Sequence, residues 1–246
     1  MTTTDANLER HIRLLLDAWF DLPEVSARPV EIDVDAFLNS VGFLNATAEC
    51  TRTFLDALPE NRIAKGILAR SIFEMGTTCV WLALRGEAGF EAMRFEDQRH
   101  HKALARELQG KVSSEELKLS VERVDTEALH PKNHLAEEAR RFEARVDSLN
   151  AGNTPLYAIY RMYSQYSHGS LGVSNSYVDV DDAGAIGLCF PAKHPALNDH
   201  LGTAIAPLVW AMNAVNKLLK GQPLAANLTT VQVLLGTGID FSLKEP

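Results

Sequence analysis

The chain has 246 residues, of which 46% are hydrophobic and 23% charged, as in ordinary soluble globular proteins. A formal charge of −8 argues against a protein that coats nucleic acid nonspecifically, because neutralising phosphates is the main source of that affinity. Three scattered cysteines without a CxxC motif are typical of reduced thiols in a cytosol. The N-terminus has no basic region followed by an apolar run, and the most apolar segment, residues 202–215, is too short to span a bilayer. We therefore expect a soluble, cytoplasmic protein with no membrane partner.

The N-terminal part of the sequence predicts a short helix, a connector and a long helix. Apolar residues at helical spacing indicate a helix over residues 8–20. Two prolines then break the pattern, so we expect residues 1–30 to form a helix and connector at the periphery of the fold. Asp33 or Asp35 can cap the long helix, which runs to about Leu58.

Two further helices are expected before residue 110. A nearly continuous apolar stripe predicts a helix over residues 60–84 that lies centrally and is covered on more than one side. Arg85 and Gly86 are expected to end it. A separate and much more polar helix is predicted over residues 90–108.

The second half of the sequence predicts shorter helices and the only strand signal, SYVDVDDAGAIGLCF, in which β-branched and aromatic residues flank DDAG. The expected elements are a helix over 114–124, a helix from Pro131 to about Leu149, a helix over 155–167, a hairpin near 176–190, an apolar helix over 197–220 that Pro207 kinks or breaks, and a helix over 224–235. We therefore predict one all-α domain over residues 1–246, a bundle of seven to nine helices with a small β-hairpin.

The tyrosine-rich stretch LYAIYRMYSQYSHGS contains one arginine and one histidine. In a helix, Arg161 and His168 lie two turns apart on one face, about 10 Å from each other along the axis. A fixed cation and a group that titrates near neutrality are suited to acid–base chemistry, and a histidine at a helix end beside Gly169 lies near solvent. The alternative is a polar core in which carboxylates and carbonyls satisfy both residues.

Arg70 and Glu74 place two charges inside the most apolar predicted helix. They are four residues apart and can face one another. Buried charges need partners, so Glu74 is expected to pair with Arg70, or with Arg161 or His168 from the tyrosine-rich stretch. The cluster is then either a functional site or a structural ion pair between helices.

His100 and His101 each follow an acidic residue by four positions, a spacing that can contribute metal ligands. The repeated Glu-x-x-His pattern of di-iron bundles is absent, as are a phosphate-binding loop, a dinucleotide-binding loop, HExxH and GxSxG. We predict no cofactor and no metal, with His100 and His101 as the remaining metal candidates.

Arg161 and His168 enclose six residues late in an all-α chain, which resembles the Arg–His motif of the HEPN superfamily (higher eukaryotes and prokaryotes nucleotide-binding). ILARSIFE at residues 67–74, combined with YRMYSQYSHGS at residues 160–170, is also similar to a set of bacterial helical proteins of unknown function. Those proteins pair an R-S-x-x-E helix with a later Y-x-H-x-S segment and are linked to HEPN folds. The resemblance spans about residues 35 to 219.

This resemblance implies a metal-independent enzyme that cleaves RNA or acts on nucleotides, in a toxin or phage-defence setting, and that works as a homodimer. His168 is then the general acid or base, and Arg161 stabilises negative charge on the phosphorane. Arg70 and Glu74 complete the expected site.

Two features of the sequence depart from the family pattern and argue against RNA cleavage. Met162 occupies a position that is often polar in active family members, and Arg140, Arg141 and Arg145 are the only basic track for RNA. The alternative function is a non-enzymatic bundle that binds a small-molecule ligand or a partner, with the Arg, Glu and His residues as a structural network.

Overall fold

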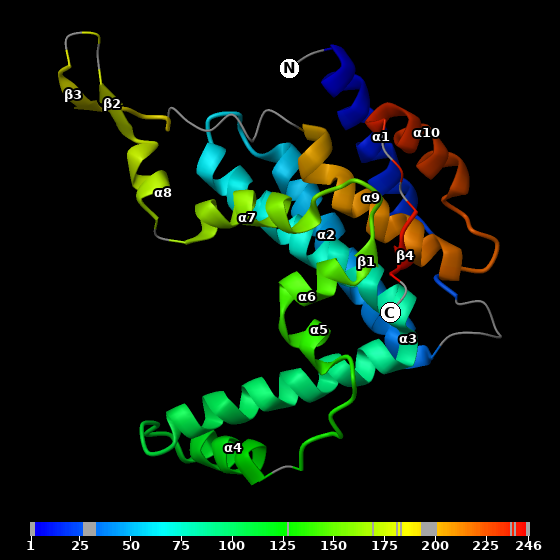
Figure 1. Cartoon of the computed structure of the whole chain (residues 1–246), viewed down its shortest axis with the longest axis vertical. Helices are drawn as coiled ribbons and strands as arrows, with labels where there is room; N and C mark the ends of the chain where they lie inside the picture. The colour runs from blue at the N-terminus through cyan, green and yellow to red at the C-terminus, as the bar shows by residue number, and fades with distance from the viewer. Residues whose placement is uncertain are drawn as a thin grey trace.

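The computed structural model describes residues 3–26, 33–126, 128–168, 170–180, 182, 184–192, 201–236, 238 and 240–244. Within these residues the chain forms ten helices and four short strands, an all-α bundle with a small hairpin as predicted (Figure 1). The elements are α1 (Thr3–Phe20), α2 (Val34–Asp56), α3 (Arg62–Leu108), α4 (Glu115–Thr126), α5 (Ala136–Arg140), α6 (Phe142–Asp147), β1 (Leu149–Asn150), α7 (Leu156–Ser167), α8 (Leu171–Asn175), β2 (Val178–Val180), β3 (Ile186–Leu188), α9 (Leu201–Leu218), α10 (Ala225–Leu235) and β4 (Ser242–Leu243).

Helix α3 is the central element, and its first half packs against α2, α7 and α9. Among the described helices it is the one long and apolar enough to cross a membrane, but 56% of its most apolar window is buried, as in the core helix of a folded domain. The phenyl ring of Phe73 lies at the centre of this core, edge-on to Trp210 of α9 and next to Tyr163 of α7. The expectation of a central, multiply covered helix is therefore confirmed.

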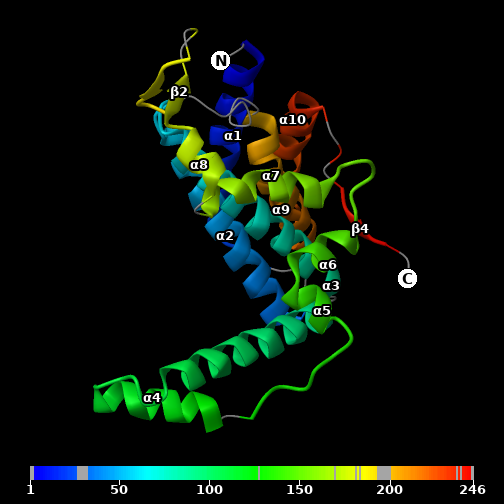
Figure 2. The same cartoon turned by 60° about the vertical axis from the view of Figure 1, so that its left-hand side comes forward.

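The predicted helix end at Arg85-Gly86 is confirmed, because α3 consists of two helices that meet at Gly86. Gly86 has φ 58° and ψ −139°, which is not a helical conformation and is one that side chains disfavour. The second helix begins directly after this glycine, earlier than the predicted residue 90, and continues to Leu108. It projects away from the body with α4 beside it (Figures 1 and 2).

The N-terminal helix is part of the core. Ile12 and Leu15 of α1 are fully buried, and Trp19 Nε1 donates a hydrogen bond to Asn45 Oδ1 of α2 at 2.8 Å. The expectation that this helix is peripheral is corrected, whereas residues 27–32 of the connector lie outside the described residues. Asp33 caps α2 as predicted, since its Oδ1 accepts a hydrogen bond from Ala36 N at 2.8 Å.

The predicted helix from Pro131 to Leu149 is broken into α5 and α6. Asn133 interrupts its start, because its side chain donates to Ala88 O of α3 at 2.8 Å and accepts from Leu135 N at 2.9 Å. Arg141 is extended between the two helices, with φ −110° and ψ 120°. The backbone hydrogen bonds from Arg141 N to Glu137 O and from Arg145 N to Arg141 O are kept, so the helix is interrupted at Arg141 by its extended backbone.

The strands form two small antiparallel pairs. The expected hairpin is confirmed: β2 pairs with β3, Val178 opposite Leu188 and Val180 opposite Ile186. A second pair joins β1 to β4 near the C-terminus and was not predicted. Two-residue strands have too little pattern to be recognised in a sequence.

Pro207 lies inside α9 and does not end it. The start that was expected at residue 197 falls outside the described residues. Gly76 of α3 faces this proline so closely that an added Cβ would lie 2.6 Å from Pro207 O. A glycine is therefore required where the backbones of the two central helices approach.

Replacing Gly76 with alanine is expected to lower the free energy of unfolding by about 2 kcal/mol, because the methyl group would meet backbone atoms that cannot move aside. Gly42 of α2 is the matched control, since an added Cβ there has no atom within 4 Å. Gly42→Ala should stabilise the protein by up to about 1 kcal/mol through helix propensity. Urea unfolding followed by circular dichroism measures both. Equal stability of the two variants would contradict the close helix contact.

Candidate functional site

One side of α3 carries five polar groups, those of Arg70, Glu74, Thr78, Trp81 and Arg85. Their spacing of three or four residues keeps them on one side of a helix. Helices α7, α6 and α5 lie against this side in that order (Figure 1). We call these five residues the polar face of α3.

Arg70 joins this face to the C-terminal end of α7. Its Nη1 donates a hydrogen bond to Ser167 Oγ, and its Nη2 donates one to Tyr160 Oη at 3.0 Å. Nη2 also lies 3.7 Å from Glu74 Oε2, so the pairing expected within the helix is present. The guanidinium stacks over the Tyr160 ring, and its Nε is buried with no hydrogen-bond partner among the described residues. Arg70 is thus a half-buried bridge between two helices.

Arg145 of α6 is a buried cation that sequence reasoning did not assign to the site. It is 8% exposed, and its Nη1 donates to Thr78 Oγ1 at 2.7 Å while its guanidinium lies over the Trp81 ring. Burial lowers the pKa of Arg145, and the negative charges of Glu74 and Glu138 oppose that change. Glu74 is therefore placed between two cations, Arg70 and Arg145.

The third cation on this side is Arg85, which forms a forked ion pair with Glu138 of α5. Arg85 Nη2 lies 2.8 Å from Glu138 Oε1, and Arg85 Nε donates to Glu138 Oε2 at 3.1 Å. The same Oε2 accepts a hydrogen bond from Trp81 Nε1 at 2.7 Å. This pair holds α5 against α3 one residue before the bend at Gly86.

Arg161 and His168 are both exposed, and within the described residues neither side chain makes a hydrogen bond or an ion pair. The structure therefore brings Arg70 and Glu74 together but does not join Arg161 or His168 to them. His168 follows the last residue of α7 with an extended backbone, φ −109° and ψ 148°. His168 is the residue directly after the end of α7, so helical spacing alone does not set its place relative to Arg161, and the expectation that the two share one face stays a prediction.

The residues on either side of His168 are held by hydrogen bonds. Ser167 Oγ accepts from Arg70 and donates to Ser164 O at 3.0 Å. Ser170 Oγ donates to Gln165 O at 2.9 Å, and Ser170 N donates to His168 O at 2.7 Å. An exposed imidazole thus sits on a turn whose described backbone is fixed at both ends.

The tyrosines of α7 divide into a buried and a half-buried set. Tyr163 and Tyr166 are buried, burial raises the pKa of both phenols, and Tyr163 Oη has no hydrogen-bond partner among the described residues. Tyr157 and Tyr160 are half-buried and stack on each other. The tyrosines therefore attach the helix to the core, and Tyr160 alone among them contacts Arg70.

The metal candidates lie on the projecting part of α3, far from the polar face in the fold. His100 and His101 are exposed, and His101 Nδ1 lies 3.4 Å from Asp97 Oδ2. Across the residues that the structure describes, no three His, Cys, Asp or Glu side chains gather closely enough to hold a metal ion.

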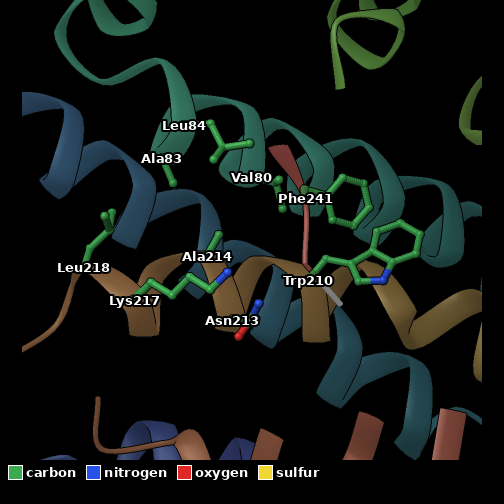
Figure 3. Close-up of a pocket in the computed structure, with 9 residues that line it drawn as sticks. All are labelled: Val80, Ala83, Leu84, Trp210, Asn213, Ala214, Lys217, Leu218 and Phe241. Carbon is green, nitrogen blue, oxygen red and sulfur yellow. The ribbon is translucent and has the colours of Figure 1, made fainter. Parts of the chain in front are cut away.

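A small pocket of about 90 Å³ lies between α3 and α9, away from the predicted site residues (Figure 3). Its walls are mostly apolar, with Phe241 packed on Trp210. Asn213 and Lys217 at its edge are both engaged with Asp240, which lowers the pKa of that carboxyl group. The pocket offers a ligand few unsatisfied polar groups.

Comparison with known proteins returned no matching family, no matching curated protein and no matching solved structure. The resemblance to HEPN proteins therefore stays a prediction.

Replacing Arg70 with alanine is expected to lower the free energy of unfolding by about 2 kcal/mol, because Ser167, Tyr160 and Glu74 all lose a charged partner. Arg94 is the control, an arginine on the same helix that is half exposed and pairs only with Glu91 of its own helix. Arg94→Ala should change stability by less than about 0.5 kcal/mol. Chemical unfolding measures both variants, and an Arg70→Ala protein as stable as the wild type would rule out the bridge.

Proposed function

We propose that this chain is a metal-independent enzyme that cleaves RNA, with His168 as the group that exchanges protons and Arg161 as the cation that stabilises charge on the phosphate. The observation that carries the proposal is the hydrogen bond from Arg70 to Ser167, the residue directly before His168. It joins the R-S-x-x-E segment to the Y-x-H-x-S segment, and it holds an exposed imidazole on a braced turn. Catalytic groups need such support, because small displacements cost large factors in rate.

The reaction follows from what the chain presents. The 2′-hydroxyl of the ribose attacks the adjacent phosphorus, its proton passes to His168, and the bond to the 5′-oxygen breaks as that oxygen takes a proton from water. His168 then gives its proton to the hydroxide that remains, which restores the base. The products are a 2′,3′-cyclic phosphate and a 5′-hydroxyl end. Arg161 stabilises the negative charge of the phosphorane. DNA lacks the 2′-hydroxyl and is not a substrate.

In this proposal Arg70 and Glu74 are positioning residues. Arg70 supports the backbone before His168, and Glu74 balances the positive charges of Arg70 and Arg145. The expected four-residue site is therefore divided into an exposed reacting pair and a half-buried supporting pair.

The surface charges restrict how RNA binds. Arg140 pairs with Glu137, and Arg141 pairs with both Glu137 and Glu143. Arg145, the third member of the expected basic track, is buried. Few phosphates are then neutralised, so the RNA affinity should depend only weakly on salt concentration.

The second candidate function is a non-enzymatic bundle that presents the turn at His168 to a ligand or partner. The specific observation in its favour is that the polar face of α3 is already occupied by side chains of α5, α6 and α7. In that case Arg70 and Glu74 have a structural role alone, and the purified chain has no RNA-cleaving activity.

Purified protein is expected to cleave single-stranded RNA in the presence of EDTA. His168→Ala should reduce the rate at least about 100-fold, the usual contribution of a general acid or base, with unchanged helical circular dichroism. His134, another exposed histidine, is the control, and His134→Ala should retain full activity. Cleavage that persists in the His168→Ala protein would contradict the nuclease proposal. Absence of activity in the wild-type chain favours the non-enzymatic function.

Replacing Ser167 with alanine removes the acceptor of the Arg70 hydrogen bond and leaves the imidazole in place. We expect kcat to fall about tenfold with KM unchanged, since the turn loosens but no group that touches substrate is lost. Ser120→Ala on α4 is the control, because its hydroxyl bonds only to Glu116 O of its own helix. An unchanged kcat for Ser167→Ala would mean that the turn needs no support from α3.

A further inference from the structure

A second cavity lies between the end of α6, the β1–β4 pair and the start of α7. It has a volume of about 240 Å³, and its walls come from residues between 146 and 158 and from Lys244, which follows β4. The elements that surround it meet at one place in the fold (Figure 1). Sites for drug-sized molecules begin at about 300 Å³, so this cavity suits a smaller ligand.

The β1–β4 pair brings two opposite charges to this cavity. Leu149 lies opposite Leu243, and beyond them Lys244 N donates a hydrogen bond to Ser148 O at 2.9 Å. This bond fixes Lys244 beside the segment that carries Asp147, and both residues line the cavity. A carboxylate and an ammonium group that are far apart in the sequence are therefore neighbours of the same open space.

Neither charge has a partner among the described residues. The Asp147 carboxylate and the Lys244 ammonium group make no hydrogen bond or ion pair, either with each other or with another described side chain. On the same C-terminal segment, by contrast, Asp240 pairs with Lys217. Two unpaired opposite charges on one cavity are complementary to a molecule that carries both an ammonium and a carboxylate group.

The other walls of the cavity are mostly apolar. Val146, Leu149 and Leu156 form its buried side. Tyr157 is half-buried, and its ring is held in place by stacking on Tyr160. An apolar group of a ligand can therefore lie on a fixed aromatic ring while the charged groups are bound beside it.

We propose that this cavity binds a free α-amino acid with an apolar side chain. The ammonium group of the ligand pairs with Asp147, its carboxylate pairs with Lys244, and its side chain contacts Tyr157. A ligand with only one of the two charges leaves one wall group unpaired and gains less.

This site does not depend on the proposed nuclease activity. Neither His168 nor Arg161 lines the cavity, so the two proposals can fail separately.

Isothermal titration calorimetry of the full chain with L-leucine tests the proposal. L-leucine should bind with a measurable heat. L-leucinamide lacks the carboxylate and 4-methylpentanoate lacks the ammonium group, so each should bind at least about tenfold more weakly, through loss of one charged contact.

Variants assign each charge to its wall group. Lys244→Met should weaken L-leucine binding at least about tenfold and leave L-leucinamide binding unchanged, because the amide has no carboxylate to lose. Asp147→Asn should weaken L-leucine binding by a similar factor and leave 4-methylpentanoate binding unchanged. Both side chains are exposed, so the helical circular dichroism of both variants should match the wild type.

Lys220→Met is the matched control, because Lys220 is an exposed lysine that does not line the cavity. It should bind L-leucine as tightly as the wild type. Absence of L-leucine binding to the wild type at concentrations up to about 10 mM overturns the proposal. Equal affinity of the wild type for L-leucine and L-leucinamide overturns it as well, and so does unchanged L-leucine binding in Lys244→Met or Asp147→Asn.

Discussion

The polar face of α3 is the constraint on which the rest of the structure depends. Charged groups inside an otherwise buried helix are tolerated only with partners, because an unpaired buried charge is strongly destabilising. Arg70 therefore hydrogen-bonds to Ser167 of α7, and Arg85 pairs with Glu138 of α5. Between them Arg145 of α6 hydrogen-bonds to Thr78 of α3. The three helices lie against α3 in the order of these pairs. The apolar faces of α5 and α6 are too short to fix their positions alone, since these helices are five and six residues long.

The same interactions connect the core to the candidate site. The guanidinium of Arg70 reaches the last residue of α7, so the position of the exposed His168 turn depends on a group inside the fold. The four residues that the sequence grouped into one site therefore fall into two pairs. Arg70 and Glu74 pair with each other inside the fold, whereas Arg161 and His168 are exposed and make no hydrogen bond or ion pair within the described residues.

The surface limits what an acidic chain can bind. Local carboxylates neutralise Arg140 and Arg141, so these two arginines offer little free positive charge among the described residues. The β2–β3 hairpin is the contrasting feature, because its exposed Val180, Ile186 and Leu188 are uncharged.

The sequence by itself determined the elements whose signals are local. Apolar spacing identified α1 and the first half of α3, the residues around DDAG identified the hairpin, and Asp33 was recognised as a candidate cap of α2. Two charges in an apolar run also pointed to Arg70 and Glu74. The helix end at Gly86 was also recognised from the sequence, whereas tertiary structure decided where residues 131–149 break and which side chains meet Arg70. Ser167 is 97 residues from Arg70 in the chain, and Arg145 is 67 from Thr78. Such pairs form only after the helices pack, so no local pattern encodes them.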